Sequence, residues 1–270
     1  MDRKYLIGGG IIICLILGLF LFSKGASRSG GSSASTASAK ELHRKAEDLV
    51  KDNELGQARE LYQQIVTNYP DADDIDTVQK ELEDLNLNII FSNKVIDGKT
   101  VVHEVGVGDS LGKIAKQYGT TTELIKRSNN LRSDVIQVGQ KIRVWTSKFN
   151  IFVDKSQNKL ILKDGDVVLK VYDVSTGANN STPIGKFKIT SKLVDPVWFN
   201  RGVVVPPESP ANVLGSRWMG FDIPGYGIHG TVEPQNVGQQ VTAGCVRMRN
   251  EEVQELYSIV PLGTEVVIVD

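Results

Sequence analysis

The chain has 270 residues, with 31 basic and 32 acidic side chains and a formal net charge of −1. This length is enough for two or three small domains with separate cores. The hydrophobic fraction of 40% and the charged fraction of 23% are those of an ordinary globular protein. Because no run of lysine or arginine stands in the body of the chain, nucleic-acid binding has no electrostatic support.

The two cysteines, Cys14 and Cys245, stand far apart, and neither belongs to a CxxC or other zinc-ligand spacing. Cys14 lies in an apolar N-terminal run, so we expect no disulfide between them. We also expect no metal and no cofactor. Cys245 is then the one thiol in the remainder of the chain.

Residues 6–22 are uncharged and strongly apolar apart from four glycines, and Arg3 and Lys4 precede them. A run of this length just spans a bilayer, so we interpret residues 1–23 as a transmembrane signal anchor with its basic end in the cytoplasm. A cleaved signal peptide is the alternative. Either one exports the remainder of the chain and predicts a place in the bacterial cell envelope. Residues 24–40 are rich in Gly, Ser and Ala and predict a flexible tether.

Residues 41–93 have apolar side chains at helical spacing, with a turn predicted at Asn53 and Gly56 and a helix end at Pro70. Asp73 or Asp74 can cap a third helix. The segment resembles one tetratricopeptide repeat, on Ala46, Leu49, Ala58, Tyr62, Ile65 and Pro70 in that order. The resemblance implies a protein partner. A plain helical spacer is the alternative, because such repeats normally stack on further copies.

Residues 101–146 predict a strand, two short helices and a final strand. Val102, Val105 and Val107 predict the first strand, and Ile142 and Val144 predict the last one. Asp109 or Ser110 can cap the first helix, and Thr121 or Thr122 the second.

This segment resembles a lysin motif (LysM). The residues that carry the resemblance are Gly108-Asp109-Ser110-Leu111, Ile114-Ala115, Tyr118, Asn130-Leu131 and Val138-Gly139-Gln140. The resemblance implies binding of glycans that contain N-acetylglucosamine, such as peptidoglycan. By that resemblance the candidate glycan contacts are Gly108, Asp109, Ser110, Leu111, Asn130 and Leu131. The alternative is that Asp109 and Ser110 only cap a helix.

Residues 149–270 predict a mainly-β domain. Strand patterns occupy residues 149–153, 160–162, 167–174, 187–190 and 265–269, and a helical pattern is found at residues 250–259. Asp164-Gly165 predicts a hairpin turn, because both residue types tolerate positive φ. Residues 195–217 hold four of the nine prolines and little periodicity, so we interpret them as a lid insertion.

This β domain contains one cysteine, Cys245, and one histidine, His229. A cysteine nucleophile needs a nearby base or cation, and His229 is the one imidazole that the domain offers. Backbone amides of Ala243, Gly244 or Cys245 can point at a developing oxyanion. A small buried cysteine and an unrelated histidine are the alternative.

The spacing between these residues resembles that of the L,D-transpeptidase catalytic domain. His229 is followed by Thr242-Ala243-Gly244-Cys245-Val246-Arg247, and further matching segments are Ser175-Thr176-Gly177, Thr182-Pro183-Ile184-Gly185, residues 215–220 and residues 225–231. The resemblance implies that the Cys245 thiolate attacks the third-residue carbonyl of a peptidoglycan tetrapeptide stem. His229 would be the base, D-Ala would leave, and an amine would accept the acyl group.

Three further side chains are expected around this chemistry. Arg247 suits a substrate carboxylate or a structural salt bridge, and Tyr226 and Trp218 line the cleft or the core. Ala243 departs from the family, which most often has a second histidine at this position. A non-catalytic wall-binding scaffold is therefore one alternative function. An L,D-carboxypeptidase-like hydrolase, in which water accepts the acyl group, is another.

Overall fold

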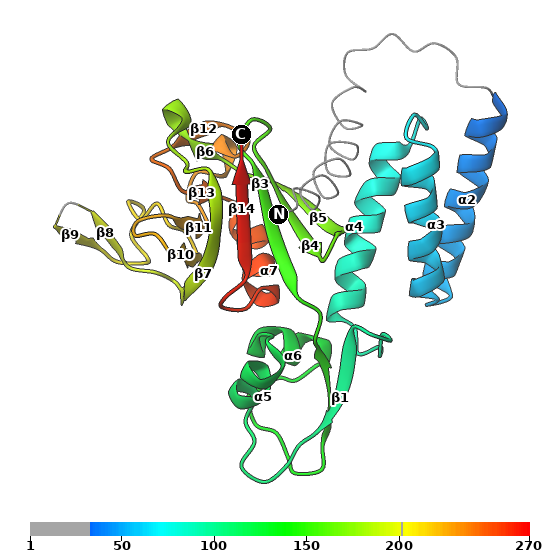
Figure 1. Cartoon of the computed structure of the whole chain (residues 1–270), viewed down its shortest axis with the longest axis horizontal. Helices are drawn as coiled ribbons and strands as arrows, with labels where there is room; N and C mark the ends of the chain where they lie inside the picture. Colours follow the sequence, from blue (N-terminus) through cyan, green and yellow to red (C-terminus); the bar gives the residue numbers. More distant parts are fainter. Residues whose placement is uncertain (1–32, 201) are drawn as a thin grey trace, which may run out of the picture. The chain divides into compact units, whose positions relative to one another are not determined.

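The computed structural model describes residues 33–200 and 202–270 (Figure 1). The predicted anchor at residues 1–23 and the first part of the predicted tether lie outside these residues. Across the described ranges, no helix has the length and apolar character needed to cross a bilayer. The chain divides into two compact units, Met1–Ile89 and Ile90–Asp270.

The first unit is helical. Its helices are α2 (Ser33–Lys51), α3 (Leu55–Asn68) and α4 (Ile75–Phe91), the last two residues of which belong to the second unit. Because α2 begins at Ser33, the prediction of a flexible tether through residue 40 is wrong for its last eight residues. Ala39 explains the difference, since alanine favours helix and this side chain is only 1% exposed.

The connections between these helices lie at the predicted turn and helix end, with one change. Asn53 has a φ of 62° and forms the turn between α2 and α3, as expected for a residue that tolerates the left-handed region. Gly56 lies inside α3, so its predicted place in the turn is wrong. The turn needs one left-handed residue, and Asn53 supplies it. α3 ends at Asn68, just before Pro70. The likeness to a tetratricopeptide repeat stays a prediction.

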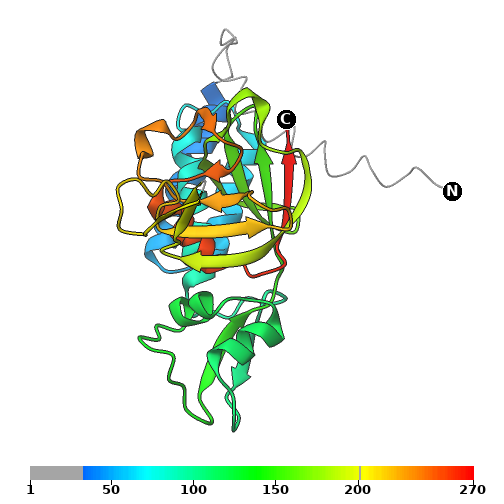
Figure 2. The same ribbon diagram turned by 90° about the vertical axis from the view of Figure 1, so that its left-hand side faces the viewer.

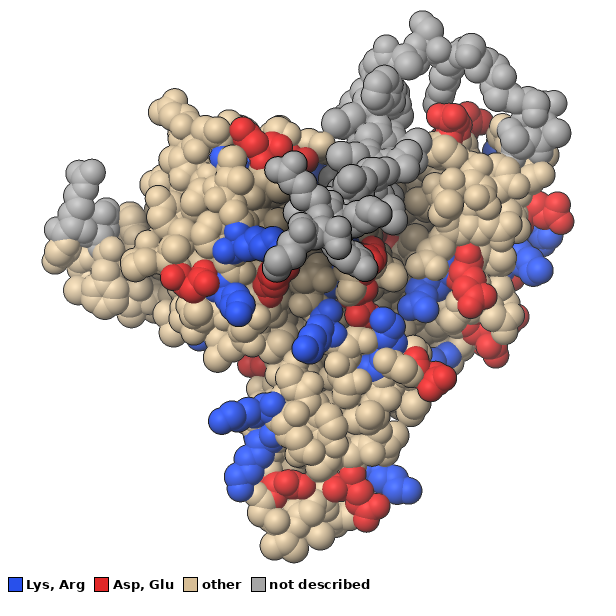
Figure 3. Space-filling view, in the orientation of Figure 1, with Lys and Arg blue, Asp and Glu red and all other residues tan. Residues whose placement is uncertain are grey.

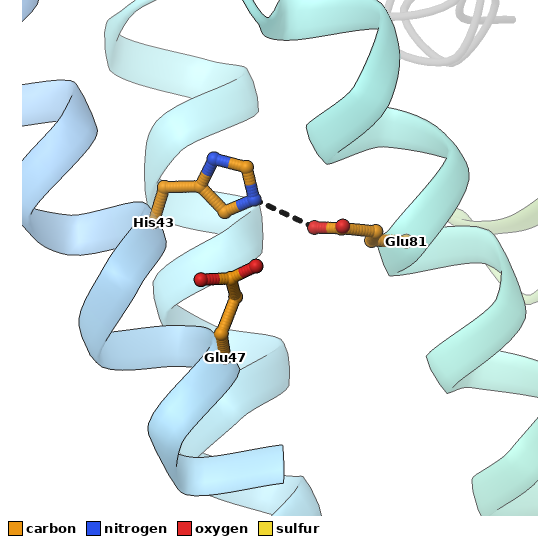
Figure 4. Close-up of side chains that lie close together, drawn as sticks. All are labelled: His43, Glu47 and Glu81. Atoms are coloured by element: carbon orange, nitrogen blue, oxygen red, sulfur yellow. Dashed lines mark hydrogen bonds and ion pairs between the residues drawn. The ribbon is translucent and has the colours of Figure 1, made fainter. Parts of the chain in front are cut away.

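A histidine links α2 to α4 (Figure 4). His43 Nδ1 lies 2.7 Å from Asp74 Oδ2, and Nε2 lies 2.7 Å from Glu81 Oε2. Burial lowers the pKa of His43, but the hydrogen bonds and charges of the two carboxylates outweigh it and raise the pKa overall.

His43, Glu47 and Glu81 form the one group in the described residues whose ligand atoms, all within 4.8 Å of one another, are spaced for a metal ion. Both ring nitrogens of His43 already contact carboxylates, one of Asp74 and one of Glu81. The cluster is therefore an ionic link between helices.

The second unit begins with a βααβ domain. Its elements are β1 (Thr100–Glu104), α5 (Leu111–Tyr118), α6 (Thr122–Ser128) and β2 (Lys141–Trp145), with β1 and β2 antiparallel. Ser110 caps α5 by accepting from the amide of Lys113, and Thr121 caps α6 by accepting from the amide of Leu124. Both caps were among the predicted ones.

The predicted first strand is too long at its C-terminal end. β1 ends at Glu104, because residues 106–108 turn and Gly108 has a φ of 85°. Val107 is 93% exposed as a result. In Figures 1 and 2 the βααβ domain forms a lobe beside the large sheet of the second unit.

The remaining residues form an eight-stranded mixed sheet with the order β13-β11-β10-β7-β14-β3-β4-β5. Its strands are β3 (Phe149–Asp154), β4 (Lys159–Asp164), β5 (Val167–Asp173), β7 (Gly185–Val194), β10 (Arg217–Phe221), β11 (Gly227–His229), β13 (Val246–Arg247) and β14 (Glu265–Val269). One helix, α7 (Asn250–Ile259), packs on β10 and β11 at the predicted position. The predicted mainly-β domain is confirmed.

Short elements border this sheet. They are β6 (Thr176–Gly177), β8 (Trp198–Asn200), β9 (Val203–Val205), β12 (Gln240–Thr242), and the 3-10 turns η1 (Ala178–Asn180) and η2 (Pro234–Asn236). The predicted insertion contains the β8–β9 hairpin, which projects from the sheet in Figures 1 and 2. Asn212, which is 1% exposed, anchors the insertion by donating to the carbonyls of Pro196 and Val205.

The raised pKa of His43 predicts a pH dependence for the helical unit. The stabilisation is fully present below the unfolded pKa of about 6.5 and is lost as the pH rises through the folded pKa. We therefore expect amide hydrogen exchange in α2 to accelerate as the pH rises above about 6.5, after correction for the intrinsic rate. His43→Gln should remove the effect, and the amides of α7 provide the internal control. An α2 profile as flat as that of α7 would contradict the ionic link.

Candidate active site

Cys245 and His229 lie at one edge of the large sheet, where two short strands pair. β11 and β13 are parallel, with His229 opposite Arg247 and Ile228 opposite Val246. Cys245 directly precedes β13, and its sulfur donates to the carbonyl of Gly225 at 3.4 Å. A backbone hydrogen bond with Gly227, the first residue of β11, also reaches the thiol. The pairing thus brings the predicted nucleophile beside the strand that carries the predicted base.

Trp218 lies against His229. The two residues are paired across β10 and β11, and their rings stack with centroids 5.9 Å apart and planes inclined by 24°. A Cβ added at Gly220 or Gly227 would come within 3.0 Å of the indole ring. These two glycines let the indole lie along the strands. Trp218 therefore holds the imidazole in place, and its predicted place in the substrate cleft stays a prediction.

The loop of residues 242–245 is fixed by contacts within it and beside it. The Thr242 hydroxyl donates to the Cys245 carbonyl at 2.7 Å and accepts from the Gly244 amide at 3.2 Å. Gly244 has a φ of 135°, and a Cβ there would lie 2.7 Å from the Tyr226 ring. Tyr226 therefore packs on the backbone of this loop. The Gly244 amide, one of the predicted oxyanion donors, is already engaged inside the loop.

His229 is buried, and burial lowers its pKa to about 4. The charge of Arg247 lowers the pKa further, while the carbonyls of Gly230 and Leu214 favour the charged form. Nδ1 lies 2.7 Å from the Gly230 carbonyl oxygen, which assigns the ring proton to Nδ1. At neutral pH the imidazole is therefore uncharged, and with the proton on Nδ1 its lone pair is on Nε2.

The Cys245 thiol is also neutral at rest. Burial raises its pKa, and the hydrogen bond with Gly227 and the charge of Arg247 only partly oppose that rise. For the predicted nucleophile this means that the thiol proton has to leave as the sulfur attacks a substrate. The site is not a preformed thiolate–imidazolium pair.

Asn250, which the sequence reasoning missed, ties the site together at the start of α7. Its Oδ1 accepts from the amides of Ser216 and Thr231, at 3.0 and 3.2 Å, and its Nδ2 donates to the Thr231 carbonyl at 2.8 Å. These bonds fix Gly230 and Thr231, directly after His229, against the end of the insertion. Only the tertiary contact reveals this role, because an asparagine before a helix looks like an ordinary cap in sequence.

Arg247 forms the salt bridge that was one of its two predicted roles. Its Nη1 donates to Glu233 Oε2 at 3.2 Å. Its Nε is buried and has no hydrogen-bond partner among the described residues. Binding of a substrate carboxylate stays a prediction, with Nε as an available donor.

The predicted glycan contacts of the βααβ domain have different structural roles. Asp109 accepts from the Gly106 amide and contacts His103, so it holds the turn, and Ser110 caps α5. The side chain of Leu111 is 2% exposed and packs in the core, and a glycan contact at this position stays a prediction. The positive φ values of Gly108 and Asn130 shape the two loops. Leu131 packs partly on the core.

Comparison with known proteins agrees with this arrangement. A family model for the L,D-transpeptidase catalytic domain matches residues 148–268, and one for the LysM domain matches residues 103–145. YqjB of Bacillus subtilis, which carries the name L,D-transpeptidase, is 40% identical over 126 residues, or 44% of this chain and 70% of that protein. The chain belongs to the L,D-transpeptidase family.

A second L,D-transpeptidase by name, YkuD of Bacillus subtilis, is 30% identical over 175 residues, which are 62% of this chain and 98% of that protein. A solved L,D-transpeptidase from Mycobacterium smegmatis matches 50% of this chain and 65% of that one, at 19% identity and a TM-score of 0.40. That match is too partial to add to the assignment. A LysM domain with an L,D-transpeptidase domain means that the enzyme binds peptidoglycan and acts in the cell envelope, outside the cytoplasm.

The neutral resting state of this L,D-transpeptidase predicts how its thiol reacts with iodoacetamide. Because burial raises the pKa of Cys245, we expect the labelling rate to keep increasing past about pH 9. His229→Gln should leave that profile unchanged, since the imidazole is uncharged above about pH 4. Mass spectrometry of the peptide that contains Cys245 measures the rate. A plateau near pH 7, as an ion pair produces, would refute a neutral pair.

Asn250→Ala should slow acylation by misplacing His229. Loss of the three hydrogen bonds is expected to cost about 1–3 kcal/mol of stability and to lower the acylation rate about 10- to 100-fold. Asn250→Asp is the matched control, because it keeps the acceptor and loses only the donor to Thr231, so it should fall in between. Stopped-flow acylation by a carbapenem gives the rate. Full activity in Asn250→Ala would remove the positioning role.

Proposed function

We propose that this enzyme is a peptidoglycan L,D-transpeptidase in which Cys245 is the nucleophile and His229 the base. The observation that carries the proposal is the strand pairing that sets the one thiol of the described chain beside β11, which ends in a neutral imidazole. The donor substrate is a tetrapeptide stem, and the scissile bond joins its third residue to D-Ala.

The reaction uses the neutral imidazole twice. As the sulfur attacks the third-residue carbonyl, the thiol proton moves to Nε2 of His229, and the carbonyl oxygen takes the negative charge. Collapse of this intermediate breaks the C–N bond, and the departing D-Ala amine takes the proton from His229. A second amine then attacks the thioester and passes its proton to the imidazole, from which the released thiolate regains it.

The oxyanion donors in this proposal are the amides of Ala243 and Cys245, because the Gly244 amide is held by Thr242. Ala243 is exposed and cannot titrate, so a second imidazole takes no part. The proposed base at His229 does not need one. Arg247 Nε, buried and unpartnered within the described residues, suits a carboxylate of the stem.

Three other parts of the chain fit this function. The hairpin of the insertion exposes Phe199, Val203 and Val204, and we assign it as a lid over the bound stem. The apolar run at residues 6–22 is assigned as an anchor that keeps the enzyme at the membrane surface. The helical unit is assigned to a protein partner.

The soluble fragment, incubated with a carbapenem or with a tetrapeptide muropeptide, tests the chemistry. Intact-mass spectrometry should show a covalent adduct on wild type and none on Cys245→Ala, while His229→Gln should acylate about 100- to 10,000-fold more slowly. Release of D-Ala and formation of a cross-linked dimer are followed by chromatography.

The alternatives give different products. A wall-binding scaffold forms no adduct and releases no D-Ala, which would overturn the proposal. An L,D-carboxypeptidase-like hydrolase releases D-Ala but yields only tripeptide stems. Glu265→Gln, an exposed change on β14 outside the insertion, controls for handling of the variants.

A further inference from the structure

A wide cleft separates the LysM domain from the catalytic domain within the second unit. Its volume is about 1100 Å³. One wall consists of α6 and the loop after it, and the other of α7 with the adjoining ends of β7 and β10. The side chains that line the cleft include Lys126, Asn130, Leu131, Arg217, Glu251 and Gln254.

The two walls are bonded at the base of the cleft. Thr121 Oγ1 donates to the Ser258 carbonyl, and Arg127 Nη1 donates to Ser258 Oγ at 3.0 Å. The Arg127 guanidinium also lies over the Phe91 ring, 3.3 Å from its centroid. These contacts join α6 to the last turn of α7, so the cleft is preformed and needs no domain closure.

The lining has the chemistry of a site for a polar polymer. Basic and acidic side chains both line it, including the pair Lys126 and Asp134 at 2.6 Å, and the side-chain amides of Asn130 and Gln254 line it as well. On the face drawn in Figure 3, charges of both signs are similarly interspersed. Such a lining offers donors and acceptors to hydroxyls and amides, and counter-charges to both amines and carboxylates. A glycan that carries peptide stems presents all four groups.

The cleft borders the predicted glycan contacts of LysM on one wall and lies across β10 from the candidate active site on the other. Asn130 and Leu131, predicted glycan contacts of LysM, are part of its LysM wall. On the catalytic wall Arg217 reaches over the Tyr257 ring, while the next residue along β10, Trp218, stacks on His229. Successive side chains of a strand point to opposite faces, so the cleft and the active site lie on the two sides of β10. A single stem at Cys245 therefore does not fill the cleft.

We propose that this cleft holds a stretch of the same peptidoglycan strand whose stem is acylated, so that LysM and the catalytic domain bind one polymer jointly. The proposal rests on the proposed transpeptidase function and adds a second polymer contact to it. The fixed angle between the walls then selects which stem along the strand reaches Cys245. The cleft therefore increases binding and turnover of polymeric peptidoglycan and has no effect on turnover of a free muropeptide.

Glu251→Trp tests this inference from the catalytic wall, outside the LysM domain. Glu251 is exposed on α7, and an indole there narrows the cleft without touching the residues around Cys245. With purified sacculi as substrate, we expect turnover and binding to fall on the order of tenfold. With a soluble disaccharide tetrapeptide, kcat/KM should stay at the wild-type value. Glu265→Trp, an exposed glutamate on β14 away from the cleft, is the matched control and should match wild type on both substrates.

The outcomes separate the two proposals. If Glu251→Trp turns over sacculi as wild type does, the cleft inference is overturned and the transpeptidase assignment stands. If wild type acts on neither substrate, both fail. If Glu251→Trp misfolds and loses activity on both substrates, Glu251→Lys replaces it, because it changes the charge at the same exposed position. A ratio of sacculus to muropeptide turnover equal to that of wild type would then overturn the cleft inference.

Discussion

The parallel pairing of β11 with β13 is the interaction on which the rest of the site depends. These strands are three and two residues long, and they belong to segments 16 positions apart, counted from His229 to Cys245. Strands this short are stable only because β10 pairs with β11 on its other side and α7 packs on β10 and β11. Ser175 adds a backbone bridge to Arg247. The sheet edge held in this way places the residue that precedes β13, Cys245, beside the strand that ends in His229.

Burial sets the chemistry of that pair. The same packing that places Trp218 on His229 removes water from the imidazole, and the sheet edge partly buries the thiol. Both groups are neutral at rest, so the thiol has low reactivity in the structure described. A free thiolate in an oxidising envelope would be open to oxidation, and a neutral thiol is much less so. The low resting reactivity is consistent with function outside the cytoplasm.

Much of the architecture was predictable from local pattern. The strand at residues 265–269, the helix at residues 250–259 and the caps at Ser110 and Thr121 follow from periodicity and side-chain hydrogen bonding. The misses have physical reasons. α2 starts early because Ala39 finds a buried place, and β1 stops early because Gly108 turns the chain. The short strands β10, β11 and β13 have too few residues for a periodic signal, so their pairing was not foreseen.

The sequence by itself determined the chemical groups: one cysteine and one histidine in the β domain, at a spacing shared with L,D-transpeptidases, behind a LysM pattern. Residue type and spacing are written directly in the chain, so they needed no fold. The tertiary structure decided the rest: that His229 is neutral, that Asn250 fixes it, and that LysM and α7 share a cleft. Burial, hydrogen bonding and domain contacts join residues distant in sequence, and no local pattern encodes them.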